Sequence, residues 1–136
     1  MKIFIICSKR FYGRIPEIKD YLEEKGHNIT LPNCYEDPQS EDQYRNMGRE
    51  GHSDWKSEMI RHSEKVICDN DAVLVLNFKK DSFLNYVGGA TFLEMYDAFR
   101  LGKKIFMYND IPEGILADEI IGFKPVIING DLDCVV

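Results

Sequence analysis

Short, continuous apolar runs alternate with segments of helical periodicity along this sequence, and no other feature restricts the possible folds as strongly. Residues 2–7 (KIFIIC) and 72–77 (AVLVLN) have the length and branched apolar content of strands that are buried on both faces. Shorter strands are predicted at 27–31, 104–108 and 125–129. Because strands that alternate with helices form parallel sheets covered on both faces, we expect an α/β fold.

Helical spacing of apolar residues separates these strands. Residues 15–25 have a proline in the first turn and are followed by Gly26, which suits a helix end. Further helices are predicted at 55–67, 90–101 and 116–121. The polar stretch from Tyr35 to Asp54 has few apolar anchors, and we predict a long loop of the kind that binds or covers a ligand.

The order of these elements predicts one domain over residues 1–136, with a flavodoxin-like, doubly wound sheet of five parallel strands and helices on both faces. In such sheets, ligands bind beyond the carboxyl ends of the strands, where the strand order reverses. The loops after the first, third and fourth strands are therefore the places to search, at residues 8–14, 78–89 and 109–114.

Charge and composition exclude several classes of function. Lysine and arginine total 17 against 23 aspartates and glutamates, and this formal charge of -6 disfavours nucleic-acid polymers as partners. No apolar run approaches the roughly 20 residues of a membrane span, so we expect a soluble, cytoplasmic protein that does not bind membranes. The four cysteines are widely spaced, and neither a metal site nor a cofactor is predicted.

The loop after the first strand, CSKRFYGR, combines a hydroxyl, three cations and a glycine in front of a predicted helix. Backbone amides at a helix N-terminus attract anions, and Lys9, Arg10 and Arg14 would add charge beside the Ser8 hydroxyl. The loop therefore allows two interpretations. It either holds a phosphate or a sugar hydroxyl, or it is an ordinary solvated loop.

The segment NYVGGATFLEMYDAFRLGKK, residues 85–104, contains the strongest candidate residues. Gly88 and Gly89 permit close approach of a ligand to the backbone, and Thr91 can help to cap the predicted helix. Glu94 lies in the first turns, at the edge of the apolar face. From the residues alone, this carboxylate either takes part in chemistry or stabilises the helix N-terminus.

The pattern Ala90-Thr91-x-x-Glu94-x-x-x-Ala98-x-x-x-Gly102-Lys103, preceded by the strand opening Asp71-Ala72-Val73-Leu74-Val75, resembles the nucleoside 2-deoxyribosyltransferase-like superfamily. That superfamily includes deoxyribosyltransferases and 2'-deoxynucleoside 5'-monophosphate N-glycosidases, which share a flavodoxin-like fold. Detailed agreement is confined to residues 71–104 and, weakly, to the Ser8 loop. The resemblance implies cleavage or transfer at the N-glycosidic bond of a deoxynucleoside or its 5'-monophosphate.

The resemblance also implies roles for single residues. Glu94 matches the catalytic glutamate, which attacks the anomeric carbon and forms a covalent glycosyl-enzyme intermediate. Asp71 matches the strand-opening aspartate, although capping of nearby amides explains it equally well. Asp81 is a candidate second acid. The substrate-binding residues that go with these assignments are Ser8, Arg10, Tyr12, Arg14, Asn77, Asn85, Gly88, Gly89 and Thr91.

Several alternatives stay open at this point. The cationic first loop favours a hydrolase of monophosphates over a transferase. Two departures from the family pattern favour a non-catalytic nucleotide-binding module instead: Tyr96 stands where the family has glycine, and no aspartate falls at the family's substrate-contacting position. An FMN-binding protein is disfavoured because the first loop lacks a Ser/Thr-rich phosphate cradle.

Trp55 and Tyr44 either stack on a base or pack within the protein. The resemblance suggests a homo-oligomer, and the apolar side chains of Phe92, Tyr96 and Phe99 suit an interface or the core.

Overall fold

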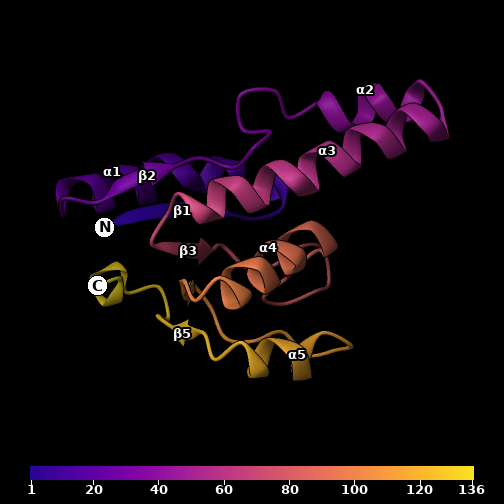
Figure 1. Ribbon diagram of the computed structural model, residues 1–136. Coiled ribbons are helices and arrows are strands. Elements are labelled where there is room, and N and C mark those ends of the chain that lie inside the picture. Colours follow the sequence, from indigo (N-terminus) through magenta and orange to yellow (C-terminus); the bar gives the residue numbers. More distant parts are fainter.

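The computed structural model describes all residues from 1 to 136 and contains a five-stranded, parallel sheet with the order β2-β1-β3-β4-β5 (Figure 1). Every neighbouring pair of strands is parallel. This is the strand order of flavodoxin-like sheets, so the predicted fold class is confirmed. The strands are β1 (Lys2–Ile6), β2 (Asn28–Thr30), β3 (Ala72–Val75), β4 (Lys104–Met107) and β5 (Val126–Ile127).

The central strands β1 and β3 form the middle of two hydrophobic cores, one on each face of the sheet. Side chains of a strand alternate between the faces, so Ile3 and Ile5 enter one core while Phe4 and Ile6 enter the other. All four residues of β3 are completely buried. Burial on both faces is the reason why these two strands appear in the sequence as continuous apolar runs.

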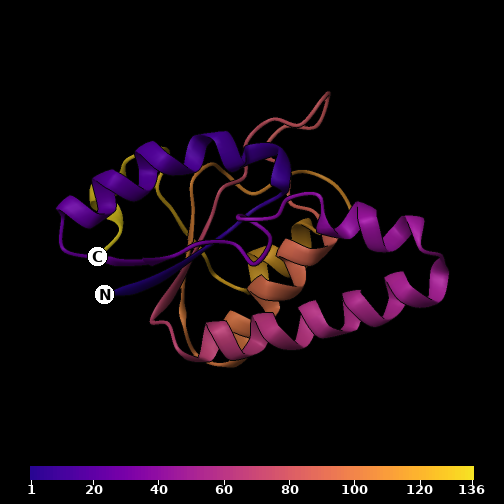
Figure 2. The ribbon, with the colours of Figure 1, turned by 90° about the horizontal axis from the view of Figure 1, so that it is seen from above.

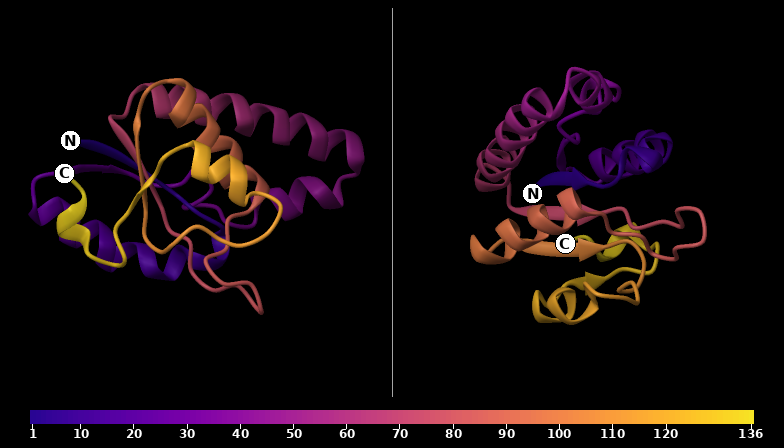
Figure 3. Two further views of the ribbon diagram at one scale, coloured as in Figure 1. Left: turned by 90° about the horizontal axis from the view of Figure 1, so that it is seen from below. Right: turned by 90° about the vertical axis from the view of Figure 1, so that its right-hand side faces the viewer.

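The helices cover both faces of the sheet (Figure 3). The helix α1 (Ile15–Glu24) packs with Ile15, Ile18 and Leu22 on one face. On the other face lie α3 (Arg49–Cys68), α4 (Gly89–Arg100) and α5 (Ala117–Gly122). Two short 3-10 helices, η1 (Lys9–Arg14) and η2 (Leu132–Cys134), complete the chain. None of the helices combines the length and the apolar character that crossing a bilayer requires.

The prediction of a long loop from Tyr35 to Asp54 was wrong. This stretch contains α2 (Ser40–Asn46) and the first turns of α3, which form a helical hairpin (Figure 2). The helix α2 has no buried residue, so the apolar spacing that identifies a helix is absent. Helix-favouring residues and the acidic side chains of Glu41 and Asp42 in its first turn stabilise it instead.

Candidate functional site

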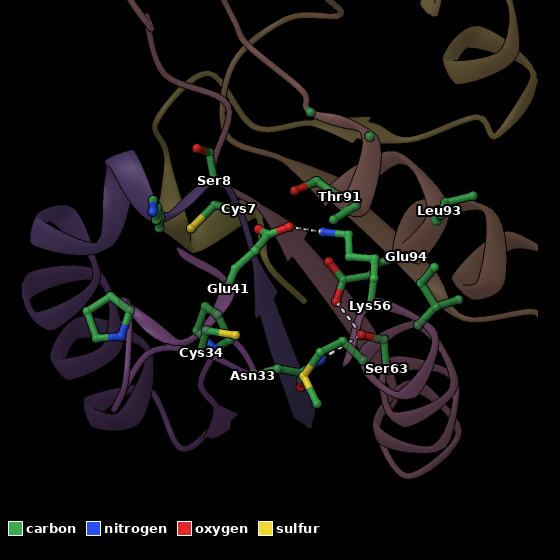
Figure 4. A pocket seen from close by; sticks show the side chains of 18 of the residues that line it. Cys7, Ser8, Asn33, Cys34, Glu41, Lys56, Ser63, Thr91, Leu93 and Glu94 are labelled. Carbon is green, nitrogen blue, oxygen red and sulfur yellow. Dashed lines mark hydrogen bonds and ion pairs between the residues drawn. The ribbon is translucent and has the colours of Figure 1, made fainter. Parts of the chain in front are cut away.

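A pocket of about 320 Å³ opens beyond the carboxyl ends of β1 and β3 (Figure 4). Its wall comes from the loop after β1, the segment between β2 and α2, the middle of α3 and the beginning of α4. The strand order reverses between β1 and β3, because β2 lies on the other side of β1. The pocket therefore lies where doubly wound sheets bind their ligands.

Glu94 extends from α4 into this pocket (Figure 4). The side chain is half-buried, and its Oε2 accepts a hydrogen bond of 3.0 Å from Ser63 Oγ on α3. Its neighbour Met95 and the next residue on the same face, Ala98, are completely buried in the core. This packing holds the backbone of α4 against the sheet and so fixes the position from which the carboxylate enters the pocket.

Burial raises the pKa of the Glu94 carboxyl to about 7, and the nearby carboxylate of Asp97 raises it as well. The hydrogen bond from Ser63 and the positive charge of Lys56 act in the opposite direction. At neutral pH the protonated and ionised forms of Glu94 are therefore present in comparable amounts. A carboxyl group with a pKa near neutrality is suited to a chemical role in a cleft.

Cys7 and Tyr12 also line the pocket, and both stay protonated at neutral pH. Burial and the nearby charge of Glu94 raise the pKa of the Cys7 thiol to about 12. Burial, followed by the neighbouring groups of Cys34, Cys7 and Glu94, raises the pKa of the Tyr12 phenol. The thiol of Cys7 is therefore a poor nucleophile, and Tyr12 can offer a proton to a hydrogen bond. The Glu94 carboxyl, in contrast, ionises in the physiological range.

The beginning of α4 forms the part of the wall that offers hydrogen-bond donors. Gly88 is the N-cap residue, and no side chain caps the first amides of α4, so the capping role predicted for Thr91 was wrong. Thr91 is only 4% exposed and its hydroxyl faces the pocket (Figure 4). At Gly88, a Cβ atom would lie 3.2 Å from Tyr86 Oη, so the glycine makes room for that ring. Uncapped amides at a helix start attract an oxygen-rich or anionic group.

A further part of the wall belongs to the α2–α3 hairpin and contributes both charged and apolar side chains. Lys56 Nζ donates a hydrogen bond of 3.1 Å to Glu41 Oε2 (Figure 4). His52 Nε2 lies 3.0 Å from the same oxygen. Trp55 is 9% exposed, stacks on Tyr44 with ring centroids 5.9 Å apart, and lines the pocket. Trp55 therefore packs within the protein and also lines the pocket, so its stacking on a base stays a prediction.

The structure brings together half of the residues that the sequence suggested for the site. Those that line the pocket are Ser8, Tyr12, Gly88, Gly89, Thr91 and Glu94. Those that lie outside its wall are Arg10, Arg14, Asp71, Asp81, Asn77 and Asn85. Of the cations in the first loop, Lys9 alone contributes to the wall, and it forms an ion pair with Asp42.

Both aspartates proposed as catalytic lie outside the pocket. Asp71 is exposed at the amino end of β3, whereas the pocket is at the carboxyl end, and its Oδ2 accepts a hydrogen bond of 2.8 Å from the backbone amide of Lys2. The amide-capping interpretation is therefore confirmed for Asp71. Asp81 lies in the turn between Lys80 and Phe83, and its exposed side chain forms an ion pair with Arg10. Each of these two carboxylates is engaged by a partner away from Glu94.

Other residues that were predicted for the site but lie outside the pocket have structural roles. Asn77 is completely buried. Its side-chain nitrogen donates hydrogen bonds to the backbone carbonyls of Asn109 and Asp110, and its side-chain oxygen accepts one from the backbone amide of Asn109. The guanidinium of Arg14 lies 4.3 Å from the centre of the Phe78 ring and pairs with Glu17. Asn85 occupies a turn with a positive φ of 54°. Polar residues after a strand serve turns and loop contacts as often as ligands, which explains these errors.

Sequence reasoning missed the polar residues that surround Glu94. Asn33, Ser63, Lys56 and Glu41 all line the pocket. Ser63 lies within the helix predicted at 55–67, to which no site residue was assigned. Glu41 and Lys56 lie in or beside the stretch predicted to be a loop. The signal that could have identified Ser63 is a small polar residue on the inward face of a helix that otherwise buries Trp55 and Ile67.

Neither a protein-family model nor a curated protein sequence matches this chain.

Proposed function

We propose that this protein cleaves or transfers at the N-glycosidic bond of a deoxynucleoside or its 5'-monophosphate, with Glu94 as the nucleophile. The observation that supports this proposal best is the Glu94 carboxylate, which a hydrogen bond from Ser63 holds in a pocket at the carboxyl edge of the sheet. The volume of about 320 Å³ lies in the range of pockets that enclose small ligands.

In the proposed reaction, ionised Glu94 attacks the anomeric carbon C1' of the sugar. The bond between C1' and the base nitrogen breaks, its electron pair leaves with the base, and a protein acid supplies a proton to that base. Water, or a second base, then attacks C1', passes a proton to the acid that was deprotonated in the first step, and releases Glu94 as the free carboxylate. Attack by water makes the protein a hydrolase, and attack by a base makes it a transferase.

Asp97 replaces Asp81 as the candidate acid. Asp97 lines the pocket three residues after Glu94, and side chains at this spacing on a helix are neighbours. Burial raises the pKa of the Asp97 carboxyl, and a nearby Glu64 raises it further, whereas Arg100 lowers it through a hydrogen bond and its charge. Its place in the pocket wall beside Glu94, rather than its pKa, makes Asp97 the candidate proton donor to the leaving base.

Two groups of residues in the pocket wall suit two parts of a nucleotide, the base and the sugar with its phosphate. Trp55, Met59 and Ile60 offer an apolar and aromatic surface on which a base can lie. The uncapped amides of α4 and the Thr91 hydroxyl suit a sugar hydroxyl or a 5'-phosphate. Lys80 also lines the pocket and adds positive charge. This arrangement accepts both a nucleoside and a monophosphate, although Arg10 and Arg14 do not take part.

A non-catalytic nucleotide-binding module was favoured in the sequence by Tyr96. This side chain is 47% exposed, lies beside Phe123 and does not line the pocket. Tyr96 therefore occupies no space that a substrate would need, and its presence is no reason to prefer binding over catalysis.

The test is release of free base, measured by chromatography, from a panel of deoxynucleosides and their 5'-monophosphates with and without an acceptor base. We expect Glu94→Gln to lose more than about 10³-fold of the turnover of the wild type, because it removes the nucleophile. Glu58→Gln, at an exposed position of α3 outside the pocket, is the matched control. Full turnover in Glu94→Gln would disprove the nucleophilic role, and binding of a nucleotide without base release would support the binding module.

A further inference from the structure

A chain of hydrogen bonds leads from the loop after β2 to the Glu94 carboxylate (Figure 4). Asn33 Nδ2 donates to Ser63 Oγ over 2.7 Å, and Ser63 Oγ donates to Glu94 Oε2 over 3.0 Å. The three side chains come from three separate segments, the β2–α2 connection, α3 and α4. Tertiary packing alone therefore creates this chain.

The chemistry of the three groups gives the chain a direction. An amide nitrogen has protons but no lone pair to offer, so Ser63 Oγ must accept the bond from Asn33. A serine hydroxyl has a single proton, and with the Asn33 bond in place this proton points to Glu94. A hydroxyl oriented in this way stabilises an ionised carboxylate more than a protonated one.

The position of Ser63 in α3 indicates a role beyond packing. Ser63 is 6% exposed, and the other buried residues of this helix are Trp55 and Ile67. A buried hydroxyl stabilises a protein little compared with an apolar residue unless it finds its hydrogen bonds. Both hydrogen bonds of Ser63 connect it to side chains that also line the pocket, those of Asn33 and Glu94.

We propose that Ser63 and Asn33 are positioning residues, which hold Glu94 in one orientation with Oε2 tied to Ser63 and Oε1 left to attack the sugar. This inference rests on the proposed function, because it assigns these two residues a task in that reaction. Neither residue touches the reacting bond in this scheme. Their effect on catalysis passes through the orientation and the ionisation of Glu94.

Several other charged or titratable groups face the same carboxyl and act beside the chain. Asp97 on α4 and Lys56 on α3 shift its pKa in opposite directions. Cys7 and Tyr12 lie close enough to Glu94 for its charge to raise their own pKa values. On α2, Glu41 binds the ammonium group of Lys56. The test must therefore change the chain while it leaves these groups in place.

Ser63→Ala removes the hydroxyl without adding volume and is the first variant. Asn33→Asp is the second, because a carboxylate in place of the amide accepts the Ser63 proton and takes it away from Glu94. Ser63→Thr keeps the hydroxyl and should preserve the behaviour of the wild type. Ser57→Ala, on the same helix but outside the pocket, is the matched control.

The first readout is the titration of the Glu94 carboxyl, followed by carbon-13 NMR in protein with labelled glutamate and assigned with Glu94→Gln. We expect its midpoint to rise by roughly one pH unit in Ser63→Ala, because a hydrogen bond to the charged form is lost. The midpoint should rise by at least as much in Asn33→Asp, because the new carboxylate also repels the charge of Glu94. The second readout is the pH dependence of base release. Its acidic limb should move upward by the same amount, and kcat below pH 7 should fall about tenfold while KM changes little.

The two readouts separate this inference from the proposed function. An unchanged NMR titration in Ser63→Ala, with the fold preserved by circular dichroism, would overturn the positioning role even if the wild type releases base. A shifted titration in Ser63→Ala, together with a wild type that releases no base from any substrate, would support the hydrogen-bond chain and would count against the reaction.

Discussion

Two regions of the molecule border the same pocket: the central sheet with the loops that follow β1 and β3, and the α2–α3 hairpin. Different forces stabilise these two walls. In β1 and β3, Ile3, Ile5 and Leu74 are completely buried. In α2 no residue is buried, and the hairpin is held by ion pairs of Glu41 and by the stacking of Tyr44 on Trp55. Segments with few buried apolar contacts open at lower free-energy cost than the core. We therefore expect the hairpin to open locally while the sheet that positions Glu94 stays folded.

The largest effect should come from the sheet. Leu74→Ala removes a completely buried side chain of β3 and leaves a cavity in the core, so we expect the free energy of unfolding to fall by about 2–5 kcal/mol. Ile60→Ala, in the hairpin wall at a position that is 41% exposed, should cost less than about 1 kcal/mol. Urea unfolding of both variants measures the difference. Equal losses would mean that the two walls share one core.

A smaller effect should come from Glu94, which joins the two walls. The ordinary pKa of its carboxyl is 4.5 and the folded value is about 7, so the folded state binds the proton more tightly and loses stability as pH rises between these values. Glu94→Gln removes this dependence. We expect the variant to be more stable than the wild type by about 1–3 kcal/mol at pH 8 and nearly equal at pH 4.

Thermal unfolding of the wild type, Glu94→Gln and the control Glu58→Gln across this pH range tests the expectation. A stability difference that does not grow between pH 4 and pH 8 would show that Glu94 is not destabilised by burial.

The smallest effect on global stability should come from the ion pairs of the hairpin. Glu41→Gln weakens the contacts with His52 and Lys56, and pairs this exposed contribute less than about 1 kcal/mol each. We expect the urea midpoint to change little, while the backbone amides of α2 exchange with solvent faster. Hydrogen exchange measured by mass spectrometry resolves this local effect. Faster exchange in β3 as well would contradict the separation of the two walls.

The two walls also differ in how far the sequence predicted them. The strands β1 and β3 and the helices α1 and α4 were predicted because burial on defined faces leaves a regular apolar pattern. The helix α2 was missed because it buries nothing and therefore has no such pattern. The same reason applies to the site. Gly88, Thr91 and Glu94 were found on one short segment, whereas Asn33 and Ser63 lie far from it along the chain.

By itself, the sequence determined the parallel α/β sheet and the edge at which the pocket lies, because both follow from local periodicity and from the alternation of strands and helices. Only the tertiary structure decided which polar groups face that pocket. Arg10 is paired with Asp81 outside it, and Asp71 lies at the other end of β3. Ser63 meets Glu94 across 31 residues of chain because α3 packs beside α4. The partner of a side chain depends on such packing, which no local pattern encodes.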